Sequence, residues 1–86
     1  MRVSISGQKF DWRYSRLRGK ANGWCYHLEK KILIDSRLSG VKRLEVELHE
    51  FLHASNPNHS EEAVTIQAAD LAEILWKVGY RISSGG

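Results

Sequence analysis

The sequence predicts an α+β fold in which a small antiparallel sheet, within residues 2–35, precedes two packed helices. Apolar and polar residues alternate in the first part of the chain, which is the period of half-buried strands. From residue 41 onward, apolar residues recur every three or four positions, which is the period of amphipathic helices. The 86 residues allow one modest core, so we expect a single domain over residues 1–82 and a flexible tail over 83–86.

Four strands are expected in the first part of the chain, near residues 3–6, 10–17, 24–27 and 31–35. The clearest alternation runs from Phe10 to Leu17. Glycine and asparagine between Gly19 and Gly23 favour a turn, because both tolerate positive φ. The last two strands are expected to form a hairpin.

Two helices follow, over residues 41–54 and 61–79. An apolar stripe indicates the first helix (Val41, Leu44, Leu48, Phe51 and Leu52). Pro57 and its polar neighbours predict the break between the helices. Ser60 stands at the expected N-cap of the second helix, and Gly79 at its end.

The first helix contains the pattern HExxH, formed by His49-Glu50-Phe51-Leu52-His53. Histidines four residues apart lie on one helix face, so His49 and His53 are expected to reach one Zn²⁺ ion. Glu50 projects beside them, where a carboxylate can take a proton from the attacking water and pass it to a leaving amine. Two surface histidines on an amphipathic helix are the structural alternative.

An open catalytic zinc site needs a third protein ligand, and His59, Glu61 and Glu62 are candidates. His59 lies six residues after His53, which is the spacing of the metzincin pattern HExxHxxGxxH, but Asn56 replaces the glycine of that pattern. Metzincins also have a methionine turn beneath the metal, and the one methionine of this sequence is Met1. Helical angles favour Glu61 over Glu62. Glu61 lies about 25° from the centre of the small residues that suit a helix contact (Ala68, Ala69 and Ala72), whereas Glu62 lies about 75° away.

The chain resembles a family of small phage-encoded zincin-like proteins that are described as metallopeptidases, similar in style to SprT-like and other minimal HExxH proteins. The resemblance covers about residues 18–81. The segments that carry it are Gly23–Cys25, Lys31–Asp35, Leu44–Ala54, Ser60–Val64, Ala69–Ala72 and Leu75–Arg81. It implies a zinc site with Glu61 as a ligand, since that position holds Glu or His in such proteins. His59 departs from the family, where this position is commonly apolar.

Three further residues are secondary candidates. Asp70 could accept a hydrogen bond from a ligand histidine, or could simply be a solvent-facing acid. Cys25 and His27 alternate on one expected strand and could bind a metal together. A buried core cysteine is the simpler interpretation of Cys25.

Charge is unevenly distributed along the chain. Residues 1–43 carry eleven Lys or Arg against three Asp or Glu, whereas residues 44–86 carry two against seven. The basic half suits nucleic acid or an acidic protein partner, or is a solvated sheet surface. A single cysteine excludes an internal disulfide framework and favours a reducing, cytoplasmic-type compartment. No apolar run is long enough for a membrane helix, so no membrane association is expected.

These observations predict a zinc-dependent hydrolase, most simply a metallopeptidase acting on a peptide or protein. Glu50 is the expected general base, and an edge strand, expected at Lys31–Asp35, would hold an extended peptide. The alternative function is a non-catalytic module in which zinc joins the two helices and the basic half binds nucleic acid or a protein. Four protein ligands, with His59 joining Glu61, would favour that alternative.

Overall fold

The computed structural model describes residues 1–82 and confirms the α+β class: a four-stranded sheet followed by two helices. The strands are β1 (Arg2–Ile5), β2 (Gln8–Ser15), β3 (Gly23–Tyr26) and β4 (Lys31–Asp35), and the helices are α1 (Gly40–Ser55) and α2 (Glu61–Lys77). The tail expected over 83–86 lies outside the described residues. Within residues 1–82, neither helix combines the length and the apolar character that crossing a membrane requires.

The sheet is mixed, with strand order β1-β2-β4-β3. β1 pairs with β2, and β3 with β4, in antiparallel register, but β2 and β4 run parallel. The expectation of a wholly antiparallel sheet is therefore corrected at this one pairing. The chain leaves β2, forms β3 at the edge and returns as β4 in the middle. β4 carries Ile32 and Ile34, both completely buried, and a central position covers these side chains best.

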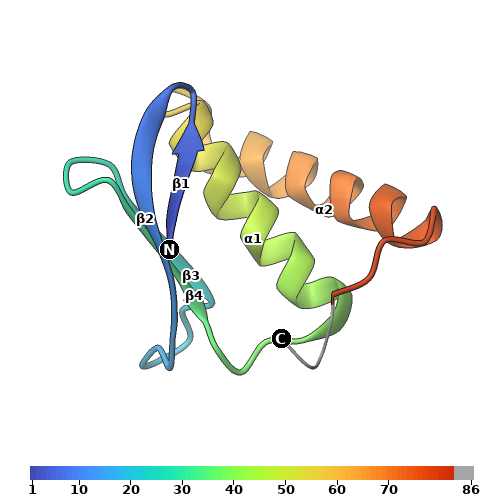
Figure 1. The fold of residues 1–86 in the computed structure, drawn as a ribbon. Coiled ribbons are helices and arrows are strands. Elements are labelled where there is room, and N and C mark those ends of the chain that lie inside the picture. The colour runs from blue at the N-terminus through green and yellow to red at the C-terminus, as the bar shows by residue number, and fades with distance from the viewer. Residues whose placement is uncertain (83–86) are drawn as a thin grey trace.

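Helix α1 lies between the sheet and α2, and both helices cover the same side of the sheet (Figure 1). Val46 and Ala54 pack with the inner side chains of the strands in one apolar cluster (Ile5, Phe10, Ile32 and Ile34). On its other side, α1 packs Leu48 and Leu52 against Val64 and Ala68 of α2. The single stripe expected on this helix is wrong in part, because Val41 and Phe51 are exposed and α1 buries two sides.

Helix α2 is attached to the rest of the fold through α1. Among the described residues it makes no close backbone approach to any strand. Ala68 and Ala72 are buried on its inner side, as the sequence predicts. The hydroxyl of Ser60 caps its start by accepting from the backbone N–H of Ala63. Gly79 follows its end at φ +108°, and the N–H of Tyr80 donates to Leu75 O, which is a Schellman ending.

Asp35 connects the end of β4 to the segment that leads into α1. Its buried carboxylate accepts from Arg37 Nη2 at 2.7 Å, from Nε at 3.0 Å and from the backbone N–H of Arg37 at 3.0 Å. Arg37 Nη2 also donates to Leu17 O at 3.0 Å. These hydrogen bonds, with the side chain of Arg37 contributing most, lower the pKa of Asp35 from 3.8 to about 2.

The free energy of unfolding is therefore expected to fall as the pH drops from about 4 to about 2. In that range the unfolded chain takes up a proton at Asp35 that the folded chain still excludes. Urea unfolding at both pH values measures the effect. Asp35→Asn should be less stable at neutral pH and lose this part of the pH dependence, whereas Asp70→Asn should keep it. An equal acid destabilisation in the wild type and in Asp35→Asn would contradict the assignment.

Candidate metal centre

His49 and His53 lie one turn apart on the face of α1 that meets the start of α2. Both side chains are largely buried. Their rings meet edge to face, with centroids 4.7 Å apart and an interplanar angle of 67°. The two Nε2 atoms are 3.1 Å apart. Helical spacing alone brings them this close, because residues i and i+4 share a face.

Glu61, the first residue of α2, brings its carboxylate to both histidines. Its Oε1 lies 2.9 Å from His49 Nε2, and its Oε2 lies 2.7 Å from His53 Nε2. Donor atoms of these three residues all lie within 4.8 Å of one another, a grouping that could hold a metal ion. Glu61 itself is 69% exposed, so the cluster is reached from solvent.

The distances suit a small cation. Donor atoms in a tetrahedral zinc site with bonds of about 2.0–2.1 Å are about 3.3 Å apart. The two Nε2 atoms are 3.1 Å apart, and each lies 2.9 or 2.7 Å from its nearer Glu61 oxygen, so a slight expansion of the group would seat an ion. If both Nε2 atoms instead carried protons, each would donate to its own oxygen of Glu61, and the two nitrogen atoms would lie 3.1 Å apart without a bond between them. A cation at the centre satisfies all three groups at once.

The other two candidates for third ligand are not part of this cluster within residues 1–82. Glu62 is exposed and lies about 100° around α2 from Glu61. His59 is exposed in the loop between the helices, where its backbone N–H donates to Asn56 O. The structure thus groups three protein donors rather than four.

Asp70 does not support the histidines. It is exposed and forms no hydrogen bond or ion pair in the part of the chain that the structure describes. The helix explains why: Asp70 lies about 13 Å along α2 from Glu61. It also lies on nearly the opposite side of the helix from buried Ala68. The expectation that Asp70 accepts from a ligand histidine is therefore corrected.

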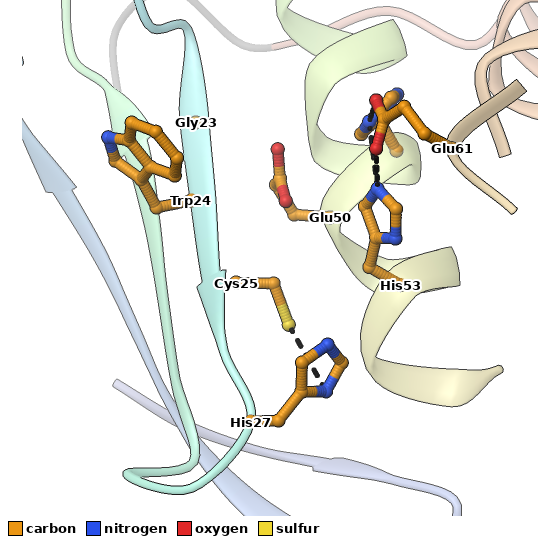
Figure 2. Close-up of a pocket in the computed structure, with 8 residues that line it drawn as sticks. Gly23, Trp24, Cys25, His27, Glu50, His53 and Glu61 are labelled. Carbon is orange, nitrogen blue, oxygen red and sulfur yellow. Dashed lines mark hydrogen bonds and ion pairs between the residues drawn. The ribbon is translucent and has the colours of Figure 1, made fainter. Parts of the chain in front are cut away.

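Glu50 is buried beside the cluster, with a relative exposure of 6%. Within the described residues, no hydrogen bond or ion pair involves its carboxylate. Burial first, and the negative charge of Glu61 second, raise the pKa of Glu50 from 4.5 to about 7. The close-up in Figure 2 shows Glu50 between strand β3 and the side chains of His53 and Glu61. A carboxylate in such a place suits proton transfer near neutral pH.

Gly23, the first residue of β3, allows Glu50 to occupy this place. A Cβ at Gly23 would lie 2.9 Å from Glu50 Oε2, 3.0 Å from its Cγ and 3.1 Å from Val46 Cγ1. No other residue type fits against the acid without a shift. From the sequence, Gly23 is expected in a turn, and its contact with Glu50 is not expected. A glycine at the start of a strand is the signal that could have indicated a close approach.

A cavity of about 420 Å³ opens between β3 and α1, beside the cluster. Glu50, Glu61 and both histidines of the motif line one side, and Gly23–Cys25 and His27 line the other. Cys25 Sγ lies 4.0 Å from His27 Nδ1. Burial, with the charge of Glu50 adding to it, raises the pKa of the Cys25 thiol to about 11. Cys25 packs against the core, as the simpler interpretation expects, and neither it nor His27 belongs to the cluster within residues 1–82.

The strand that borders this cavity is β3, and β3 is an edge of the sheet. The prediction of an edge strand at Lys31–Asp35 is wrong. That segment is β4, and it is paired on both sides, with β2 and with β3. The free backbone edge available to an extended peptide is therefore that of Gly23–Tyr26.

Comparison of the chain with protein-family models, with curated proteins and with solved structures finds no match.

Proposed function

We propose that the protein is a zinc-dependent peptidase in which His49, His53 and Glu61 hold the metal and Glu50 is the general base. The observation that carries this proposal is the convergence of two imidazole nitrogens and a carboxylate beside a buried glutamate whose carboxylate has no hydrogen-bond partner within residues 1–82. The resemblance to small phage-encoded zincin-like proteins points the same way, and we propose membership of that group on the same residues. A reducing, intracellular compartment fits the free thiol of Cys25.

A zinc ion at this site would polarise the scissile carbonyl and lower the pKa of a water molecule. The residues of the chain would transfer the proton and admit the substrate. Glu50 accepts a proton from the attacking water at its carboxylate and later donates it to the leaving amine. Burial of Glu50 keeps bulk water away from that proton, and the open side at Glu61 admits the substrate.

The substrate is proposed to be an extended peptide that adds to β3 as a further strand. Main-chain hydrogen bonds to the free edge of Gly23–Tyr26 would place a peptide bond over the cavity. Because β3 is four residues long, it can pair with a short extended segment, which an unfolded chain offers more readily than a folded surface. Cleavage of a denatured protein by the zinc-loaded chain, and loss of cleavage with a chelator, test this proposal. No cleavage of a broad peptide library by the loaded protein would contradict it.

Gly23→Ala is expected to lower peptide hydrolysis by about 100-fold while zinc remains bound. The added methyl group pushes the Glu50 carboxylate away from β3. A displacement of about 1 Å at a reacting group lowers the reaction rate by about this factor. Hydrolysis rates and zinc content, measured on the same preparation, check both halves of the prediction. Full activity in Gly23→Ala would show that the position of Glu50 against β3 is not required.

A second candidate function is a non-catalytic module in which zinc joins the helices. This function is favoured because α2 packs against α1 and against no strand of the described fold. A metal held by both helices would strengthen the contact between them. In this case zinc would raise stability without any hydrolysis, and the partner would be a nucleic acid or an acidic protein bound through residues 1–43.

A further inference from the structure

Neither helix of the described residues covers the outer face of the sheet, because α1 and α2 lie on its other side (Figure 1). Side chains alternate along each strand, so the neighbours of the core residues point outward. Residues 1–43 hold most of the basic side chains of the protein, and the metal centre uses none of them. The side chains exposed on this outer face therefore indicate which kind of partner the basic half can bind.

Strand register arranges the outer residues in two rows across the sheet. One row runs from Trp24 through Leu33 to Arg13. The next row runs from Tyr26 through Lys31 and Asp11 to Arg2. The rows are about 7 Å apart along the strands.

Two aromatic side chains stand side by side at one end of these rows. Trp24 is 50% exposed and Tyr26 is 38% exposed, although the core of so small a chain would gain from burying either ring. Figure 2 shows Trp24 on the side of β3 that faces away from α1. Lys31 Nζ lies 5.3 Å from the centroid of the Tyr26 ring. The face thus combines flat, accessible rings with a neighbouring cation.

The charge on this face is predominantly positive. Its cations are Arg2, Lys9, Arg13 and Lys31. Two acids share the face. Asp11 accepts from Arg13 Nε at 2.6 Å, which leaves further N–H donors on that guanidinium. Asp35 is buried under Arg37. A polyanion is therefore the complementary partner.

We propose that this outer sheet face binds single-stranded nucleic acid, with Trp24 and Tyr26 stacking on bases and Arg13 and Lys31 contacting phosphates. Exposed rings bind splayed bases, which a duplex keeps inside its own stack. An acidic peptide would use the cations but gains nothing comparable from the rings. Trp24 and Tyr26 alternate on β3 with Gly23 and Cys25. Trp24 also borders the cavity, but its ring lies on the side of β3 that faces away from α1 (Figure 2), so the two sites lie on opposite sides of β3.

Fluorescence anisotropy with labelled dT and rU oligonucleotides of about ten nucleotides tests the proposal on the full chain. Binding of either oligonucleotide at about 50 mM salt is expected, and the stronger one identifies the sugar that is preferred. Trp24→Ala and Tyr26→Ala should each weaken binding about tenfold, and Trp24→Phe should restore most of the loss. Tyr80→Ala, which removes an exposed ring outside the sheet, should bind like the wild type.

Salt dependence provides the second readout. Arg13→Ala should reduce the slope of log affinity against log salt by about 0.7, while Lys77→Ala on α2 should not. Zinc content should be unchanged in Trp24→Ala, since the ring points away from the metal cluster. No binding at low salt would overturn the proposal. So would a preference for duplex or polyglutamate, or equal affinity in the wild type and both aromatic variants.

Discussion

Replacing Glu50 by Gln is expected to reduce peptide hydrolysis by about 10²–10⁴-fold while zinc stays bound. The amide keeps the size of the acid but cannot accept the proton of the attacking water. The proposed metal donors are His49, His53 and Glu61, which the substitution does not change. Burial also favours a neutral group at this position, so the variant should fold at least as well as the wild type.

Initial rates on a quenched fluorescent peptide, measured with zinc content on the same samples, provide the comparison. Glu62→Gln is the matched control, because it removes an exposed acid next to a proposed ligand without changing the cluster. It should hydrolyse the peptide at the wild-type rate. Hydrolysis by Glu50→Gln at the wild-type rate would remove Glu50 from the mechanism.

Zinc at about 100 times its dissociation constant is expected to raise the melting temperature by about 10–20 °C. Such a concentration stabilises the folded chain by about 2.7 kcal/mol. In a domain of this size, each 1 kcal/mol shifts the melting temperature by about 4–8 °C. A metal held by His49, His53 and Glu61 would tie α2 to α1, the one helix or strand of the described fold against which α2 packs closely.

Differential scanning calorimetry with and without zinc measures this shift. Glu61→Ala should abolish it, and the exposure of Glu61 means that the change itself costs the fold little. Glu62→Ala, the neighbouring acid, should retain the full shift. An unchanged zinc effect in Glu61→Ala would show that the metal is bound elsewhere.

Local periodicity was sufficient to predict the helical part of the site. A spacing of four residues places His49 and His53 on one face whatever the rest of the chain does. The position of Glu61 followed from the cap at Ser60 and from the small residues that face α1, both of which the structure contains. These features depend on interactions within a few helical turns.

The arrangement of the sheet could not be predicted in this way. The parallel pairing of β2 with β4 and the edge position of β3 depend on how a hairpin docks beside a strand far away in the sequence. Alternation in β4 is compatible with an edge or a central position. The burial of Glu50 against Gly23 is likewise a contact between elements that are distant in the sequence. The HExxH pattern alone therefore does not predict the raised pKa of Glu50.

Metal stoichiometry is the most direct test of the central claim that His49, His53 and Glu61 bind zinc. We expect one zinc ion per chain after reconstitution in the wild type and in Glu62→Ala, and almost none in His49→Ala or Glu61→Ala. X-ray absorption at the zinc edge should show nitrogen and oxygen neighbours without sulfur. Absence of stoichiometric zinc in the wild type, or its retention in both ligand variants, would contradict the claim.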